Sequence, residues 1–198
     1  MNQNYSHIAV DNIVNLIEII QQEESKHPYN IDHRGAKYLL NQTIRQLWLP
    51  INRMYLSVEA EKLFTSLGFK EEEIFLHFSR MKIINKTDKV QTVNLYKGAS
   101  SKPHGKKSLK KGESFLLREV FHDDHIIPIT HIIKKLLTIN EPNRENVFEV
   151  LRDISVCRML KEEDRRLSRT KRPYDEKFII EKLYYDKDIR IKNYQYPN

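Results

Sequence analysis

Apolar residues in the first part of the chain recur at intervals of three and four, which is typical of amphipathic helices. This spacing runs over residues 8–24 and again over 35–47. Ser57 is a suitable N-cap for a third helix, and Gly68 a suitable C-cap. The acid-rich stretch that follows predicts a further helix leading into a strand. The pattern therefore predicts a mainly helical region over residues 1–84.

The second part of the chain mixes both periodicities. Short apolar runs predict strands, and three- and four-residue spacing between them predicts helices. The predicted strands are VQTVNLY (90–96), SFLLREVF (114–121), SVCRML (155–160) and DIRIKNY (188–194). The predicted helices cover 129–139, 143–154 with Asn143 as N-cap, the stretch KEEDRRLSR from Lys161, and YDEKFIIEKLYY (174–185). The pattern as a whole indicates the α+β fold class.

One segment combines strong positive charge with little apolar surface. Residues 97–112 hold six lysines, a histidine, three glycines and no acid. Such a composition cannot bury a core of its own, so we expect a mobile loop or arm. The whole chain carries a net charge of +7. A protein this basic accumulates on polyanions, of which nucleic acid and anionic membrane surfaces are the nearest candidates.

Cysteine content and hydropathy indicate the compartment. The chain has one cysteine, which allows no intramolecular disulfide and no zinc site built on paired cysteines. No stretch approaches the eighteen or so apolar residues of a membrane span. We therefore expect a cytoplasmic protein that does not bind membranes.

The sequence HDDHIIPITH, at 122–131, concentrates ionisable side chains in an apolar run. A histidine such as His125 titrates near neutral pH and can take a proton from water, and a carboxylate such as Asp124 can hold a divalent metal ion. Two residues are too few for a tight metal site. Further ligands are available in the acidic triplet Glu162, Glu163 and Asp164, at the start of the helix that follows SVCRML.

This arrangement resembles the HNH, or ββα-metal, nucleases. Their first motif is commonly Asp-His followed by two apolar residues and proline, as in residues 124–128 here. The resemblance implies that His125 is the general base and Asp124 a metal ligand. It also implies a second ligand, usually Asn or His, early in the closing helix. Asp164 takes that place here, with Glu163 as the alternative, and a helical insert separates the two strands.

The resemblance further implies a restriction- or defence-type endonuclease that cleaves DNA. Residues 85–198 would form a ββα-metal core with a helical insert, and residues 1–84 a recognition or dimerisation region. Oxygen-rich ligation favours Mg²⁺ or Mn²⁺. A double-strand cut is most simply made by a homodimer. The alternatives are a ribonuclease of the same fold and a basic nucleic-acid-binding protein without catalysis.

Several other side chains are candidates for the same site. Arg158 is expected to steady the phosphate in catalysis, because a guanidinium can grip two oxygens at once. His122 and Asn146 are further candidate ligands for the metal or a phosphate. Contacts to the nucleic-acid backbone are expected from basic residues on the lysine-rich segment and around the strands: Lys102, Lys106, Lys107, Lys110, Lys111, Arg118, Arg165 and Arg166.

Overall fold

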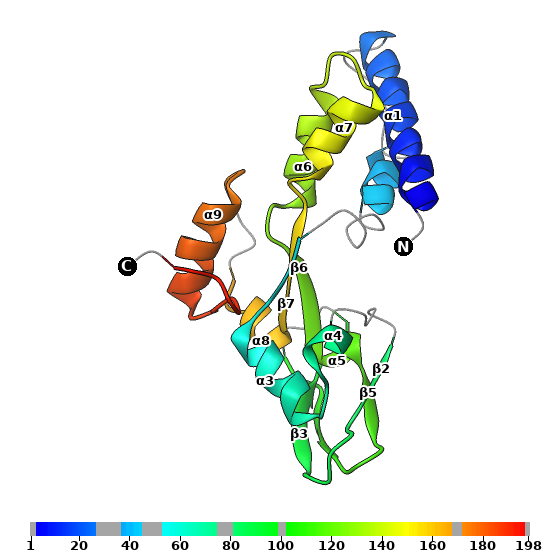
Figure 1. Cartoon of the computed structure of the whole chain (residues 1–198). Helices are drawn as coiled ribbons and strands as arrows, with labels where there is room; N and C mark the ends of the chain where they lie inside the picture. Colours follow the sequence, from blue (N-terminus) through cyan, green and yellow to red (C-terminus); the bar gives the residue numbers. More distant parts are fainter. Residues whose placement is uncertain are drawn as a thin grey trace. The chain divides into compact units, whose positions relative to one another are not determined.

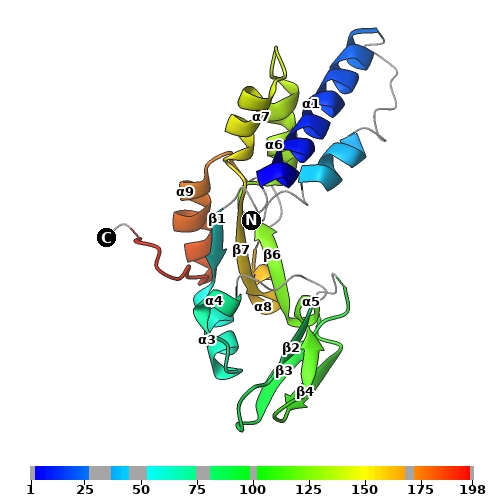
Figure 2. The same cartoon turned by 45° about the vertical axis from the view of Figure 1, so that its right-hand side comes forward.

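The chain folds into two compact units (Figures 1 and 2). The computed structural model describes residues 3–26, 37–44, 53–74, 81–98, 102–167 and 172–196. Unit 1 comprises residues 1–53, 125–156 and 172–176, and unit 2 comprises residues 54–124, 157–171 and 177–198. The boundary expected at residue 84 therefore lies inside unit 2. Composition changes there, but the chain crosses between the units elsewhere.

Unit 1 is helical. It contains α1 (Gln3–Lys26), a helix over residues 37–44, α6 (Ile129–Leu137) and α7 (Arg144–Leu151). Helix α1 packs against both α6 and α7, as both ribbon views show. The core is aliphatic: Val10, Ile13, Ile17, Ile20, Ile132, Leu136, Val147 and Leu151 are buried. The helical insert therefore buries its apolar faces against the N-terminal helix.

Polar contacts fix the pairing of these helices. Gln21 of α1 donates from Nε2 to the carbonyl oxygens of Leu137 and Ile139, at 3.2 and 2.7 Å. These carbonyls lie at the C-terminal end of α6 and just beyond it, where no intrahelical donor remains. Asn143 caps α7 by accepting a hydrogen bond from the Asn146 N–H at 2.9 Å. The predicted cap of this helix is confirmed.

Unit 2 surrounds an aromatic core. Its helices and strands are α3 (Val58–Ser66), α4 (Glu71–Ile74), β2 (Lys82–Ile84), β3 (Gln91–Leu95), β4 (Gly105–Leu109), β5 (Ser114–Leu116) and α5 (Leu117–Val120). It also contains α8 (Lys161–Asp164). The Phe64 and Phe121 rings stack with centroids 4.4 Å apart, and the Phe115 ring lies 6.3 Å from that of Phe121. Ser57 caps α3, as predicted, by accepting from the Ala60 N–H.

The lysine-rich segment is not a free arm over the residues described. Residues 105–109 form β4, which pairs antiparallel with β3 in the register Gln91↔Leu109 to Leu95↔Gly105. Leu109 is buried and Lys107 is half-buried, whereas Lys106 is exposed. The expectation of a mobile loop here is wrong, because β3 supplies hydrogen bonds and apolar surface that the segment lacks alone.

The strand expected over 114–121 is interrupted. Strand β5 ends at Leu116, and α5 forms one helical turn before β6 (Phe121–His125) begins. Glu119 stabilises that turn, because its side chain accepts a hydrogen bond from the Leu116 N–H at 2.7 Å. Local backbone capping thus divides an apolar run that periodicity alone reads as one strand.

The strands that carry the candidate site belong to one sheet, in the order β1-β7-β6. Strand β1 spans Arg53–Leu56. Strand β7 spans Ser155–Leu160, which are the bounds predicted for it. The Ile126 N–H donates to the Ser155 carbonyl, which joins the end of β6 to the start of β7 and makes the two strands antiparallel. The chain order is therefore strand, helical insert, strand and short helix α8.

The C-terminal region departs from prediction in its last element. The expected helix is present as α9 (Glu176–Phe178), the π-helical η1 (Ile179–Tyr184) and the 3-10 turn η2 (Tyr185–Lys187). The expected strand at 188–194 is reduced to one bridge between Ile191 and Ser57. Asp188 and Asn193 have φ of 55° and 57°, left-handed values that interrupt an extended backbone. No helix among the described residues is long and apolar enough to span a membrane.

Candidate metal centre

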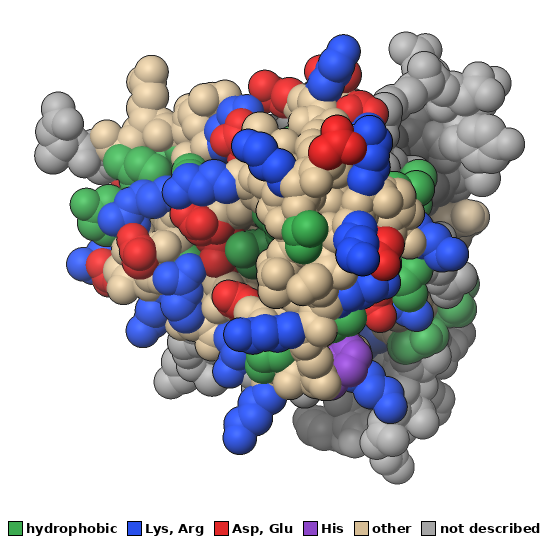
Figure 3. All heavy atoms as spheres, turned by 90° about the horizontal axis from the view of Figure 1, so that it is seen from below, with side chains coloured by type: hydrophobic (Ala, Val, Ile, Leu, Met, Phe, Trp, Pro, Cys, Tyr) green, Lys and Arg blue, Asp and Glu red, His purple; other side chains and the backbone are tan. Residues whose placement is uncertain are grey.

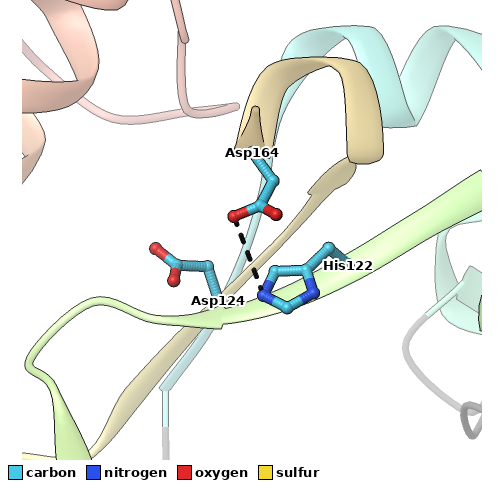
Figure 4. A group of neighbouring side chains, drawn as sticks. All are labelled: His122, Asp124 and Asp164. Atoms are coloured by element: carbon cyan, nitrogen blue, oxygen red, sulfur yellow. Dashed lines mark ion pairs between the residues drawn. The ribbon is translucent and has the colours of Figure 1, made fainter. Parts of the chain in front are cut away.

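The alternation of side chains along β6 divides its charged residues between two faces. Successive side chains of a strand point to opposite sides, so His122 and Asp124 share one side and Asp123 takes the other. Figure 4 shows the His122 ring facing Asp164 of α8, with Asp124 on the same side of β6. The Asp123 carboxylate binds Arg158 of the neighbouring strand β7.

The Arg158–Asp123 pair is a buried anchor between the two strands. Arg158 donates from Nε and Nη2 to the two carboxylate oxygens of Asp123, at 2.7 and 3.0 Å. Its Nη1 donates to the Ile74 carbonyl at 2.8 Å. The Arg158 side chain is 0% exposed and that of Asp123 18%. This two-point contact fixes the register of Asp123 and, through the strand, the side on which His122 and Asp124 lie.

Helix α8 is held in place by a buried acid. Glu163 accepts hydrogen bonds on Oε2 from the Leu160 N–H at 2.8 Å and the Ser57 hydroxyl at 2.5 Å. Glu163 is 2% exposed, and among the described residues its Oε1 has no hydrogen-bond partner. Burial raises the pKa of its carboxyl, because a charge inside the protein loses its hydration. Glu163 therefore serves the helix start, whereas Asp164, the next residue, faces β6.

His122, Asp124 and Asp164 form one group. Each offers a ligand atom, and these atoms all lie within 4.8 Å of one another. His122 Nε2 is 3.8 Å from Asp164 Oδ1, the ion pair drawn in Figure 4. Three ligand atoms bonded to one ion at about 2.1 Å lie on average no more than about 3.6 Å apart, so binding would draw the three groups together by up to about an ångström. Tyr184 donates its hydroxyl to Asp124 Oδ2 at 2.5 Å, which orients that carboxylate.

The donor set fits a divalent cation. Two carboxylates supply negative charge and hard oxygen ligands, and an imidazole supplies one nitrogen. The Asp164 side chain is 10% exposed and that of His122 38%, so the group has both a sheltered and an open side. An open side is what a metal site needs in order to accept water or substrate.

Three predicted ligands or bases lie outside this group. His125 is the last residue of β6, and by alternation it lies on the opposite face of the strand from His122 and Asp124. Its carbonyl oxygen accepts a hydrogen bond from Arg172 at 3.2 Å. Glu163 serves as the cap of α8, not as a member of the group. Asn146 is exposed on α7, where its side chain donates to the Glu141 carbonyl. His125 as general base thus stays a prediction that rests on the sequence pattern.

The predicted phosphate-binding residues divide by exposure. Arg158 is buried and bonded to Asp123, so the expected contact of its guanidinium with a phosphate is not supported. Arg118, Arg165 and Arg166 are exposed in unit 2. Lys102, Lys106 and Lys110 are exposed too, Lys107 donates to the Ser114 carbonyl, and Lys111 pairs with Asp88. In the space-filling view of Figure 3, Lys and Arg side chains are spread over the face, with acidic groups between them.

Sequence reasoning missed the supporting residues Asp123, Ser57 and Tyr184. The sequence does contain a signal for Asp123, because alternation along the strand HDDH places it on the opposite face from His122 and Asp124. Ser57 was assigned only as a helix cap, and it both caps α3 and binds Glu163. Nothing local to Tyr184 indicates that its hydroxyl reaches a residue sixty positions away.

No protein-family model, curated protein or solved structure matches this chain significantly.

The buried ion pair predicts that removing one partner lowers the stability strongly and that removing the second partner as well recovers most of the loss. Arg158→Met leaves the Asp123 carboxylate without its guanidinium, and we expect the free energy of unfolding to fall by about 3–5 kcal/mol. Removing both charges in Arg158→Met/Asp123→Leu is expected to recover most of this loss. Urea denaturation measures both. The control is Arg152→Ala, which breaks an exposed pair with Glu149 and costs less than about 1 kcal/mol. Equal losses of unfolding free energy for Arg158→Met and Arg152→Ala would contradict a stabilising role for the Arg158–Asp123 pair.

Glu163 predicts a pH-dependent term in stability. The ordinary pKa of this carboxyl is 4.5, and burial raises the pKa in the folded protein. Between these values the folded state holds a proton that the unfolded chain has released, so the free energy of unfolding falls as pH rises through this window. Glu163→Gln keeps an acceptor for Ser57 and Leu160 and cannot ionise. We expect its stability relative to wild type to increase from acid to neutral pH, as measured by urea denaturation.

The matched variant for that measurement is Glu163→Ala. It removes the acceptor for the Ser57 hydroxyl and the Leu160 N–H, so we expect a loss of about 1–3 kcal/mol. If Glu163→Gln follows the wild-type pH profile throughout, the buried carboxyl does not contribute in this way.

Proposed function

We propose that this protein is a metal-dependent endonuclease that hydrolyses DNA phosphodiester bonds. The observation that carries the proposal is the convergence of His122, Asp124 and Asp164 from β6 and α8 on one point. Two carboxylates and an imidazole would hold a divalent ion, and such an ion would supply the positive charge that phosphodiester hydrolysis needs.

Two further features support a nucleic-acid substrate. The order strand, helical insert, strand and short helix is the order that the resemblance to ββα-metal nucleases implies, and β6 and β7 are neighbours in one sheet. The net charge of +7 favours a polyanionic partner. DNA is preferred over RNA, and a restriction- or defence-type role in a homodimer over others, by analogy with that family.

The chain's own residues have separate roles in the proposed reaction. The sequence pattern assigns the general base to His125, whose ring would have to turn toward the face of β6 that carries His122 and Asp124 to take a proton from the attacking water. Tyr184 and the Arg158–Asp123 anchor keep Asp124 oriented. Because Arg158 is committed to Asp123, the phosphate charge is met by exposed cations of unit 2, of which Arg118 lines the same cavity as His122.

The imidazole ligand refines the choice of metal. Mg²⁺ strongly prefers oxygen ligands, whereas Mn²⁺ accepts oxygen and binds imidazole more readily. The expectation of Mg²⁺ or Mn²⁺ therefore becomes a preference for Mn²⁺. With His122→Asn, which lacks the ring nitrogen, we expect that preference to shrink.

The direct test is plasmid cleavage with the purified protein. Supercoiled DNA is incubated with Mn²⁺, Mg²⁺ or EDTA, and nicked and linear products are separated on a gel. We expect cleavage with Mn²⁺, slower cleavage with Mg²⁺ and none with EDTA. Asp124→Asn and Asp164→Asn are expected to slow cleavage by at least about 100-fold, since each removes a charged ligand.

The control for these variants is Asp188→Asn. Asp188 is 83% exposed and has a left-handed backbone, which asparagine also tolerates. It should cleave like wild type. Wild-type protein that binds DNA but leaves it intact under every metal condition would overturn the nuclease and favour the non-catalytic binding protein. Cleavage of structured RNA alone would favour the ribonuclease.

The two histidines predict different defects. We expect His125→Ala to lose cleavage while its Mn²⁺ affinity, measured by calorimetry, stays within about threefold of wild type. His122→Ala is expected to lose Mn²⁺ affinity by about 10- to 100-fold. If His125→Ala cleaves DNA at the wild-type rate, the general-base assignment is wrong. The metal centre is tested separately, and an unchanged Mn²⁺ affinity of His122→Ala would contradict it.

A further inference from the structure

A cavity of about 860 Å³ adjoins the candidate metal centre within unit 2. His122 belongs to both, and Tyr96, Arg118, Phe121 and Lys161 also line the cavity. Its volume falls in the range of about 300–1,000 Å³ that is typical of ligand pockets and far exceeds what one phosphate needs. The cavity therefore calls for a larger occupant than a backbone phosphate.

The charge of the lining is positive in effect. The basic residues of the lining are Lys97, His104, Arg118, His122 and Lys161, and its acidic residues are Glu119 and Asp123. Both acids are engaged inside the protein: Glu119 accepts from the Leu116 N–H, and Asp123 binds Arg158. Lys97 and Arg118 are exposed, and basic groups outnumber acids in the lining. An anionic occupant is favoured.

Tyr96 supplies a second, independent indication of a polar ligand. The residue is 2% exposed, and its hydroxyl is buried with no hydrogen-bond partner among the described residues. Tyr96 lines this cavity and also a smaller one of about 400 Å³, so it forms a wall between them. A buried hydroxyl without a partner costs about 1–3 kcal/mol, which a polar ligand atom would relieve if the Tyr96 side chain shifts enough to meet it.

The concave shape discriminates between paired and unpaired DNA. In a duplex the phosphates lie on a convex surface and the bases are stacked inside, so protruding side chains suffice to bind it. Only a nucleotide that has left the stack can enter a pocket. We propose that this cavity takes one unpaired nucleotide of the substrate strand, beside the phosphate that is cut. The proposal rests on the proposed endonuclease function and names its substrate as DNA with an unpaired nucleotide at the cleavage position.

Binding in EDTA tests the cavity without cleavage. Fluorescence anisotropy is measured with three labelled oligonucleotides of related sequence: a single strand, a paired duplex and a duplex with one bulged nucleotide. We expect the bulged duplex to bind at least about tenfold more tightly than the paired duplex. Lys97→Ala/Arg118→Ala is expected to weaken binding of the bulged and single-stranded probes by about tenfold or more, and of the paired duplex by much less.

Two further variants separate the cavity from general charge and folding effects. Lys89→Ala/Lys187→Ala removes the same charge at exposed positions outside the lining and should change the affinities for all three probes about equally. Tyr96→Phe removes only the hydroxyl. We expect it to leave the thermal midpoint unchanged or higher and to weaken binding of the bulged probe about fivefold.

The proposal is overturned if the paired duplex binds as tightly as the bulged one, or if Lys97→Ala/Arg118→Ala and the control double variant weaken all probes alike. These outcomes leave the metal centre untouched, because cleavage by wild type and its loss in Asp124→Asn are measured separately. Conversely, a preference for unpaired probes without any cleavage would retain the cavity and reject the nuclease.

Discussion

The candidate site depends on the buried contact between Arg158 of β7 and Asp123 of β6. A strand presents alternate residues to alternate sides, so fixing one side chain fixes its neighbours. The guanidinium has no exposure to solvent and donates to both oxygens of Asp123 and to the Ile74 carbonyl. A slip of one residue in β6 would bury His122 or Asp124 in its place. The ion pair therefore specifies which carboxylate of the consecutive aspartates is available to a metal ion.

The second support of the site is the way in which the chain leaves β7. Helix α8 starts directly after the strand, and Glu163 closes its first turn while binding Ser57 at the start of α3. Consecutive residues on a helix point about 100° apart, so a Glu163 directed inward to Ser57 leaves Asp164 directed to β6. Adjacent acids thus take unlike tasks. One is buried with a raised pKa, and the other completes the group with His122 and Asp124.

Local signals predicted much of the framework, and long-range contacts explain what they missed. The caps at Ser57 and Asn143 and the bounds of β7 follow from short-range preferences, and the structure confirms them. Strand β4 was not predicted, because its pairing with β3 supplies what its own composition lacks. Within the site, Asp124 and Asp164 lie close together, and their role as metal ligands stays a prediction. Arg158 was assigned to substrate because sequence does not show whether an arginine already has an internal partner.

The central claim is that one divalent ion joins β6 to α8 through His122, Asp124 and Asp164. Anomalous diffraction from a crystal grown with Mn²⁺ tests it most directly, because the signal locates the ion without reference to activity. The account predicts one peak within about 2.0–2.4 Å of His122 Nε2 and of an oxygen of each aspartate. A strong peak elsewhere, with these three side chains bonded only to one another, would contradict it.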